Sequence, residues 1–452
     1  MITSPSFAGK RYAVMGLART GQAAVRALLA SGAQVSAWDS REEPRQALAE
    51  EYDGQVELAD PVNADLTGLT GIVVSPGVPL NRHPIAEAAA RAAVPLISDI
   101  ELFAQARPFL PEHRVVGITG TNGKSTTTAL VHHLLQEAGV PSVMGGNIGL
   151  PILGQQPLSP NENGAGVYVL ELSSYQIDIT QSLDCDVAMC LNLSPDHLDR
   201  YGTFEAYVAS KARLFGMQGF GRLALVDYRS EMDEDILRHA PEGQRFKFID
   251  GVELPDDQAA WPSLQGPHNR ANAAAAVACA RELGVDEPTI ARGLRSFRGL
   301  PHRMERVAEA KGVIFINDSK ATNPASTAPA LAAFPPRWPA DGAGPRIHWI
   351  LGGLPKGDDL DDCAPFFGNI AAAYIIGDAG PRFAEILEPH MPVHRSEMMS
   401  EAIRQAIAAA VPGDVVLLSP ACASFDQFRD YEARGDAFRQ LVDALLAEGT
   451  GA

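Results

Sequence analysis

The chain has 452 residues, and its 37 lysines and arginines against 55 aspartates and glutamates give a formal net charge of −18 at pH 7. Apolar residues make up 46% of the chain and charged residues 20%, which is the composition of an ordinary folded protein and excludes a fibrous or disordered one. At roughly one domain per 150 residues, this length predicts about three domains. The negative charge disfavours unspecific electrostatic binding to nucleic acid or anionic lipid, so we expect no nucleic-acid partner. Any anionic ligand must instead be bound by local groups.

The cysteines and the apolar runs narrow the class further. The cysteines form no CxxC pair and no zinc spacing, so we expect reduced and mostly buried thiols. The N-terminus has no apolar core long enough for a signal peptide, and no stretch reaches the ~18 apolar residues of a membrane span. We therefore expect a cytoplasmic enzyme, and the lack of an obvious exposed hydrophobic stripe favours a monomer. The cysteines are Cys185, Cys190, Cys279, Cys363 and Cys422.

Short apolar runs alternate with helical stretches along the chain, which is typical of α/β domains with parallel sheets. The first block contains a predicted helix at 20–31. Its predicted strands are 11–16, 34–39, 71–75 and 95–99. Pro108 and Pro111 interrupt both helices and strand ladders. We therefore place a domain boundary near residue 105.

The second block, expected to span 106–300, continues the same rhythm. Its predicted helices are 124–138, 204–215 and 269–283, and its predicted strands are 115–119, 167–172, 187–193 and 223–226. A turn rich in glycine and proline at 299–303 suits a hinge to the third block, 301–452. The predicted strands of the third block are 313–317, 347–351, 373–376 and 415–419, and its tail at 448–452 is predicted to be disordered.

The strongest local signal lies at 117–126, where the sequence reads GITGTNGKST. A glycine loop between a strand and a helix lets backbone N–H groups surround phosphate oxygens at the positive end of the helix. Lys124 is then placed to reach the terminal phosphates, and Ser125 to ligate Mg²⁺. Ile118 stands where the strict P-loop pattern has glycine, so the loop is a shorter variant. The pattern predicts nucleotide phosphate binding and not a plain glycine turn.

A second glycine pattern follows the first predicted strand. Gly16 and Gly21 match the first and third glycines of a dinucleotide fingerprint, and Ala18 replaces the second. Asp39 stands about 20 residues further on, where an acidic partner for a ribose is expected. By itself this pattern favours NAD. Ala18, however, hinders the close approach of a pyrophosphate, which favours a different nucleotide.

The glycine loop resembles the ATP loop of the Mur ligases and of the related folylpolyglutamate synthetases, which are ATP-dependent amide-forming enzymes. The likeness extends over essentially the whole chain, through motifs at 145–149, 171–176, 196–201, 210–212, 268–272, 300–303, 317–323 and 419–428. The resemblance implies an N-terminal Rossmann-like domain for UDP (1–105), a central P-loop-type ATPase domain (106–300) and a C-terminal Rossmann-like domain for glutamate (301–452). It also implies a ligase that adds D-glutamate to UDP-N-acetylmuramoyl-L-alanine through an acyl phosphate, in peptidoglycan precursor synthesis.

The resemblance assigns residues to ATP and to two Mg²⁺ ions, and ATP would lie between the second and third blocks. The implied ATP contacts are Gly120, Thr121, Asn122, Gly123, Lys124, Ser125, Thr126, Asn269, Asn272, Arg303 and Asp318. The implied metal ligands are Ser125, Glu171, His197 and Lys211. Lys211 is expected to be carbamylated by CO2 or bicarbonate, which turns a cation into an anion able to ligate Mg²⁺. Lys124, His197 and Lys211 form the expected catalytic set.

The resemblance also assigns residues to the other two substrates. For the UDP-sugar they are Arg19, Thr20, Asp39, Ser40, Arg41, Gly77, Asn147, Ser173 and His197. For glutamate they are Lys320, Thr322, Lys356, Ser424, Phe425 and Phe428. A dicarboxylate needs two cationic or N–H sites, and Lys356 lies in a loop after a predicted strand, which suits one of them.

Alternative functions stay open at this stage. One alternative is the same ligation step with L-glutamate in place of D-glutamate. Another is a sister ligase of the Mur or folylpolyglutamate type, which would take a different acceptor or amino acid. An NAD-dependent oxidoreductase predicts nicotinamide binding at 16–21. A nucleotide sensor without turnover predicts that Lys211, Lys320 and Lys356 are dispensable.

Overall fold

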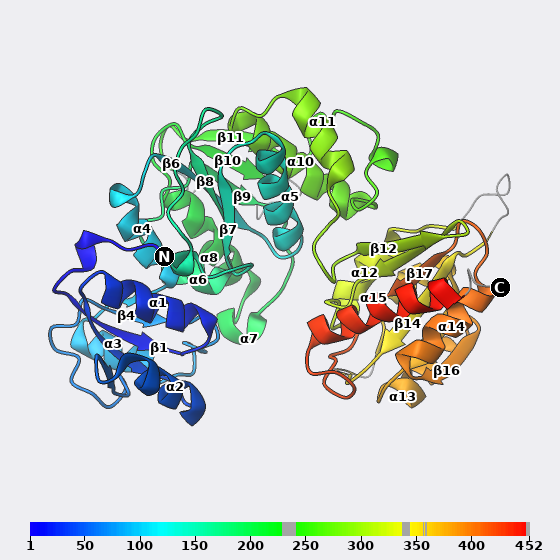
Figure 1. Cartoon of the computed structure of the whole chain (residues 1–452), viewed down its shortest axis with the longest axis horizontal. Coiled ribbons are helices and arrows are strands. Elements are labelled where there is room, and N and C mark those ends of the chain that lie inside the picture. Colours follow the sequence, from blue (N-terminus) through cyan, green and yellow to red (C-terminus); the bar gives the residue numbers. More distant parts are fainter. Residues whose placement is uncertain (228–240, 337–343, 356, 358, 449–452) are drawn as a thin grey trace. The chain divides into compact units, whose positions relative to one another are not determined.

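The computed structural model describes residues 1–227, 241–336, 344–355, 357 and 359–448 (Figure 1). Within these residues the strands form three sheets, of five, six and six strands. The chain divides into two compact units. The first comprises Met1–Leu254 with Ala274–Ile290, and the second comprises Pro255–Ala273 with Ala291–Ala452.

The N-terminal sheet has the order β3-β2-β1-β4-β5, with every pair parallel. Its strands are β1 (Arg11–Met15), β2 (Gln34–Trp38), β3 (Val56–Leu58), β4 (Gly71–Val74) and β5 (Leu96–Ile97). Its helices are α1 (Arg19–Ala30), α2 (Glu42–Tyr52) and α3 (Ile85–Ala92). The predicted strand at 95–99 is shorter than expected, because Ser98 Oγ accepts a hydrogen bond from Glu101 N and caps α4 (Asp99–Ala106).

The central sheet has the order β11-β10-β9-β6-β8-β7 and is also parallel. Its strands are β6 (His113–Thr119), β7 (Ser142–Gly146), β8 (Gly166–Glu171), β9 (Val187–Cys190), β10 (Leu223–Val226) and β11 (Arg245–Phe248). The helices that follow them are α5 (Lys124–Glu137), α6 (Ser174–Asp178), α7 (Leu198–Tyr201), α8 (Phe204–Gly216), α10 (Pro267–Glu282) and α11 (Glu287–Ser296). The strand predicted at 187–193 ends at Cys190, because Asn192 leaves the ladder and its carbonyl accepts a hydrogen bond from Thr121 N at 2.9 Å.

One continuous apolar core joins the first two sheets. Phe103 on α4 packs edge-on against Tyr168 on β8, with ring centroids 5.0 Å apart. Ile2 N donates to Leu153 O at 2.9 Å and ties the start of the chain to the same core. These contacts hold the N-terminal and central sheets in one unit.

The C-terminal sheet has the order β12-β13-β17-β14-β15-β16. Its strands are β12 (Glu305–Ala310), β13 (Val313–Asn317), β14 (Ile347–Gly352), β15 (Ile370–Ile376), β16 (Val393–Glu397) and β17 (Val415–Leu418). Its helices are α12 (Pro324–Ala332), α13 (Gly380–Leu387), α14 (Met399–Ala409) and α15 (Tyr431–Glu448). The expectation of parallel strands fails at the edge, where β12 pairs antiparallel with β13. Lys311 and Gly312 join the two strands with φ values of 50° and 77°, which a two-residue hairpin turn requires.

All five cysteines are free and buried, which confirms the prediction of reduced thiols. None of the described helices is long and apolar enough to span a membrane. Of the tail predicted to be disordered at 448–452, Glu448 is instead the last residue of α15, and 449–452 lie outside the described residues.

Candidate active site

The phosphate loop connects the carboxyl end of β6 to the first turn of α5. Gly123 precedes the helix with φ 83°, a conformation that glycine adopts without strain. Asn122 N donates to Asn192 Oδ1 at 2.8 Å, which braces the loop against the segment after β9. Lys124 Nζ donates to Gly120 O at 3.0 Å and to Thr121 O at 2.7 Å, so the lysine side chain folds back over its own loop.

Ser125, Glu171 and Asn147 come together beside this loop. Ser125 Oγ donates to Glu171 Oε2 at 2.5 Å, and Asn147 Nδ2 donates to Glu171 Oε1 at 3.0 Å. Glu171 ends β8, and Asn147 follows β7, so the carboxyl ends of neighbouring parallel strands deliver both side chains. The Glu171 carboxylate is buried, and both of these contacts come from neutral groups.

Lys211 is a buried lysine on α8. Its Nζ donates to Gly120 O at 2.9 Å and to Thr119 Oγ1 at 3.3 Å, and it lies 4.6 Å from the centre of the Tyr207 ring. Burial, with a further contribution from the charge of Lys124, lowers the pKa of Lys211 to about 7. The lowered pKa favours the uncharged, nucleophilic form of this amine more than in an exposed lysine.

His197 precedes α7 with a left-handed backbone, φ 52° and ψ 32°. Its imidazole is 44% exposed. Nδ1 lies 3.0 Å from the Tyr175 hydroxyl, and Nε2 lies 3.5 Å from Asp196 Oδ2.

A cleft of about 350 Å³ collects residues from the predicted catalytic and UDP-sugar sets. It unites Lys124 and Lys211 from the catalytic set with Gly77, Asn147 and Ser173 from the UDP-sugar set, and His197 from both. Its lining residues are Pro76, Gly77, Lys124, Asn147, Ser173, Ser174, Tyr175, His197, Tyr207 and Lys211. Tyr175 and Tyr207 are absent from the predicted sets. In a sequence, an aromatic residue in a helix is as consistent with a packed core position as with a functional site.

A larger hollow of about 800 Å³ lies at the carboxyl ends of the N-terminal strands. Six predicted UDP-sugar residues line it: Thr20, Asp39, Ser40, Arg41, Gly77 and Asn147. Arg19 does not line it, because its guanidinium donates to Gly149 O at 3.3 Å. Residues that line the hollow and that the prediction missed include Trp38, Asp60, Asn63 and His83. Pro76, Gly77 and Asn147 line both hollows, so the two are adjacent.

Asp39 shapes the glycine turn in this hollow. Its Oδ2 accepts from Leu17 N at 2.7 Å, and its Oδ1 accepts from Arg41 N at 3.0 Å. Burial acts to raise the pKa of Asp39, but these N–H groups and the charge of Arg41 outweigh it, so the pKa lies below its ordinary value. Asp39 is thus a carboxylate that fixes the turn and also faces the hollow.

The second unit holds the remaining predicted ATP contacts. Asn269 Nδ2 donates to Gln265 O at 3.0 Å, and Asn272 Nδ2 donates to Asn269 Oδ1 at 3.2 Å, so the two asparagines share one face of α10 as predicted. Asp318 accepts from Ser419 Oγ at 2.7 Å, and burial raises the pKa of Asp318 to about 7. Arg303 lies in a tight turn, and its backbone N–H donates to Leu300 O at 3.1 Å.

Five of the six predicted glutamate residues follow the ends of two adjacent strands, β13 and β17. Lys320 Nζ lies 5.0 Å from the centre of the Tyr431 ring. Ser424 is buried, Phe425 is 69% exposed, Phe428 packs against the core, and Thr322 is half-buried. Lys356 lies outside the described residues.

Arg434 on α15 links these two strand ends and is absent from the predicted sets. The side chain is buried, and its Nη2 donates to Ser319 O at 2.9 Å and to Cys422 O at 3.0 Å. From the sequence alone, an arginine in a helix is expected at the surface, so no sequence signal distinguishes Arg434 from an exposed arginine.

Three family descriptions match consecutive parts of the chain. "Mur ligase MurD-like, N-terminal domain" matches residues 10–98, "Mur ligase middle domain" matches 118–249, and "Mur ligase, glutamate ligase domain" matches 302–422. The UDP-N-acetylmuramoylalanine–D-glutamate ligase of Novosphingobium aromaticivorans is 64% identical over 450 residues, which cover 99% of this chain and 98% of that one. The ligase of the same name from Sphingopyxis alaskensis is 58% identical, covering 99% and 100%. The chain belongs to the Mur ligase family.

Solved Mur ligases share its fold. MurC of Thermotoga maritima superposes with a TM-score of 0.55 at 16% identity, covering 96% of this chain and 99% of that one. MurF of Acinetobacter baumannii superposes with a TM-score of 0.54 at 16% identity, covering 97% and 92%. The predicted Mur ligase architecture of three α/β domains is thereby confirmed. The boundaries near residues 105 and 300 stay predictions.

The donor groups beside the phosphate loop fit the Mg²⁺ and ATP that Mur ligases use. Mg²⁺ prefers one or two carboxylates together with phosphate oxygens and water, and it seldom occupies a cage made of protein alone. The described residues contain no group of three or more His, Cys, Asp or Glu side chains placed to hold a metal ion by themselves. The Ser125 hydroxyl and the buried Glu171 carboxylate instead offer the small oxygen set that a phosphate-bound Mg²⁺ requires.

Proposed function

We propose that this Mur ligase adds D-glutamate to UDP-N-acetylmuramoyl-L-alanine with ATP, through an acyl phosphate, in peptidoglycan precursor synthesis. The observation that carries the proposal is the cleft in which Lys124, Lys211 and His197 meet Asn147, which also lines the nucleotide-sized hollow. The two relatives at 64% and 58% identity carry the name of this ligase and support the same reading.

The reaction forms an amide from a carboxylate in two transfers. A carboxylate oxygen of the acceptor attacks the γ-phosphorus of ATP, and ADP leaves. The amino group of glutamate then attacks the acyl carbon, phosphate leaves, and the nitrogen loses a proton. Negative charge accumulates around the transferring phosphoryl group, so the cations Lys124 and Mg²⁺ are required beside it.

Ser125, Glu171, His197 and Lys211 are the proposed Mg²⁺ ligands, and bound Mg²⁺ would neutralise charge on the phosphate oxygens. Lys211 would serve as a carbamate: its neutral Nζ attacks CO2, a C–N bond forms, and one proton is released. The contacts that support this are its burial and its position against Gly120 O at the phosphate loop. A second Mg²⁺ ion belongs to the same proposal.

The remaining roles follow the residue sets given above. The 800 Å³ hollow would hold UDP. Arg19, whose guanidinium bonds Gly149 O, keeps its predicted role in binding the UDP-sugar. Asn269, Asn272, Arg303 and Asp318 would contact ATP. The glutamate carboxylates would be held by the residues predicted for them at the ends of β13 and β17, and by Lys356. A monomer and a cytoplasmic location stay predictions.

The deciding experiment measures phosphate release by the purified full chain with ATP, Mg²⁺ and UDP-N-acetylmuramoyl-L-alanine. D-glutamate, L-glutamate and a diamino acid are added in parallel reactions. Release that requires both the UDP-sugar and D-glutamate is the expected outcome. Preference for L-glutamate would keep the chemistry and change the stereochemistry, and a diamino acid requirement would indicate a sister ligase. If none of the amino acids supported phosphate release, the ligase proposal would fail and a nucleotide sensor without turnover would be the function to test.

A further inference from the structure

His197 stands in a part of the cleft where regular structure does little to hold it. It lies between β9 and the four-residue helix α7, with φ 52°. A non-glycine residue in this left-handed conformation is strained, so its surroundings have to fix it. The half-exposed imidazole can also turn over, which exchanges Nδ1 and Nε2. For a catalytic or metal-binding histidine, the nitrogen that remains available decides its chemistry.

Tyr175 is much more firmly placed. It belongs to α6, whose start is closed by a capping box in which Gln176 N donates to Ser173 Oγ and Ser173 N donates to Gln176 Oε1. The Arg200 guanidinium lies 3.7 Å from the centre of the Tyr175 ring. The Arg200 side chain is only 10% exposed and lies 3.9 Å from Asp178 Oδ2. The ring of Tyr175 is therefore held from its own helix and from α7.

The Tyr175 hydroxyl meets the imidazole at one particular nitrogen. It lies 3.0 Å from His197 Nδ1, within ordinary hydrogen-bond distance, and the two ring centroids are 5.0 Å apart. His197 Nε2 lies 3.5 Å from Asp196 Oδ2, at the outer limit of such a bond. Nδ1 thus has the closer partner, and Nε2 lies beside the Asp196 carboxylate.

We propose that Tyr175 is a positioning residue for His197: its hydroxyl accepts a hydrogen bond from Nδ1–H and leaves Nε2 unprotonated to bind Mg²⁺. Metal-binding histidines usually donate their other ring N–H to an oxygen, and the Tyr175 hydroxyl supplies that oxygen here. The inference rests on the proposed ligase function for the role of Mg²⁺. It does not rest on that function for the tautomer, which is a property of the protein alone.

The test compares Tyr175→Phe with the wild type, using full-length protein labelled with ¹⁵N-histidine. Spectra at about pH 8, where an ordinary imidazole is neutral, report which ring nitrogen carries the proton. His197→Gln assigns the signal. Tyr12→Phe is the matched control, because the Tyr12 hydroxyl is buried and has no hydrogen-bond partner among the described residues. Melting temperatures are measured for both Phe variants.

The wild type and Tyr12→Phe are expected to show His197 with its proton on Nδ1, and Tyr175→Phe a mixture of both tautomers. The Mg²⁺ concentration for half-maximal phosphate release should rise about tenfold in Tyr175→Phe, as is typical when a partner of a metal ligand is lost. An unchanged His197 signal in Tyr175→Phe, or a wild-type proton on Nε2, would overturn the inference whatever the activity. A wild type that releases no phosphate would instead overturn the proposed function, because the tautomer is measured without turnover.

Discussion

Ser125 Oγ donates a hydrogen bond to Glu171 Oε2 across 2.5 Å, although the two residues are 46 positions apart in the chain. The bond joins the first turn of α5 to the end of β8, directly beside the phosphate loop. It places a hydroxyl and a carboxylate side by side, which is the arrangement that a phosphate-bound Mg²⁺ uses.

Replacing Glu171 with Gln should therefore weaken Mg²⁺ binding while keeping the fold. The amide has nearly the same shape as the carboxylate and still accepts from Ser125, but it carries no charge. We expect the Mg²⁺ concentration for half-maximal phosphate release to rise about tenfold or more. Titration of Mg²⁺ at saturating ATP measures this, and the melting temperature checks the fold. An unchanged Mg²⁺ requirement would remove Glu171 from the proposed metal site.

Lys211→Ala should lose activity by about 100-fold or more, because several kcal/mol of charge stabilisation would disappear with the carbamate. Wild-type enzyme freed of bicarbonate should lose activity in the same way and recover it when bicarbonate is returned. ¹³C-bicarbonate should give a carbamate signal in the wild type that Lys211→Ala lacks. Lys10→Ala, at an exposed position, is the control and should behave like the wild type. Activity that is indifferent to bicarbonate would contradict the prediction.

His268 makes the stability of the protein depend on acid pH. Burial lowers the pKa of His268 from 6.5 to about 4, so the folded protein holds this imidazole neutral over a range in which the unfolded chain protonates it. Its contribution is complete above pH 6.5 and is lost as the pH falls from 6.5 to about 4. With about 1.4 kcal/mol per pKa unit, the loss is on the order of 3 kcal/mol.

The measurement is the free energy of unfolding in urea for the wild type and His268→Gln. The difference between the two, wild type minus variant, should shrink by this amount between neutral pH and the acid end of the window. A difference that stays constant over the same pH range would show that His268 has the same pKa in the folded and unfolded states.

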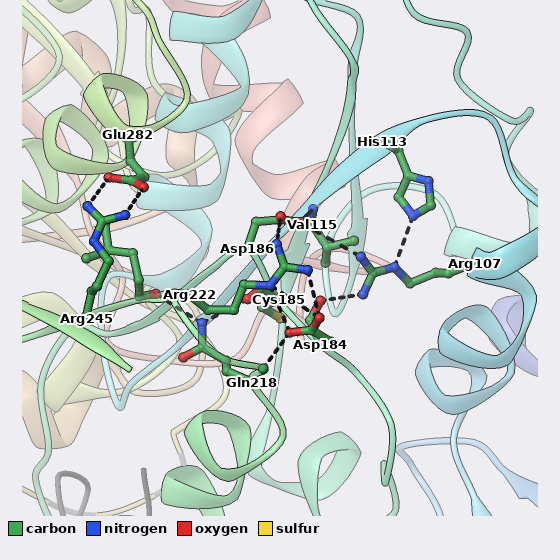
Figure 2. A network of polar contacts seen from close by, with 12 residues as sticks. Arg107, His113, Val115, Asp184, Cys185, Asp186, Gln218, Arg222, Arg245 and Glu282 are labelled. Atoms are coloured by element: carbon green, nitrogen blue, oxygen red, sulfur yellow. Dashed lines mark hydrogen bonds and ion pairs between the residues drawn. The ribbon is translucent and has the colours of Figure 1, made fainter. Parts of the chain in front are cut away.

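Arg222 should stabilise the fold without affecting ATP binding. It lies in a polar network at the amino ends of β6, β9 and β10 (Figure 2), where its Nη2 lies 2.8 Å from Asp184 Oδ2 and its Nη1 bonds Asp186. The phosphate loop follows the opposite, carboxyl end of β6. Arg222→Ala should therefore lower the free energy of unfolding by about 1.5–3 kcal/mol and leave the KM for ATP unchanged.

Arg26→Ala is the matched control for this loss of charge. The Arg26 side chain is 45% exposed, and its Nε lies 3.1 Å from Glu51 Oε1. An exposed pair of this kind contributes about 1 kcal/mol or less. Urea unfolding of both variants, with steady-state kinetics in ATP, decides the comparison. An equal loss in the two variants would indicate that burial of the network adds nothing.

Several elements were predictable because their signal is local. The strands predicted at 223–226 and 313–317 coincide with β10 and β13, and α5 begins at Lys124 as predicted. Short strands such as β3 and the exposed strand β11 were missed, because they bury too little apolar surface to show a pattern. The antiparallel strand β12 was missed as well, since its pairing is decided by the turn at Lys311 and Gly312.

The sequence by itself determined the class of fold, the phosphate loop and the family, because apolar periodicity, glycines with positive φ and ordered motifs are all properties of neighbouring residues. Only the tertiary structure decided that Arg19 bonds Gly149, that Arg434 is buried between two strand ends, and that Tyr175 meets His197 Nδ1. Partners, burial and the lowered pKa of Lys211 depend on segments far apart in the chain. A hydrogen bond or a desolvation cost arises between such segments only once the sheets have brought them together.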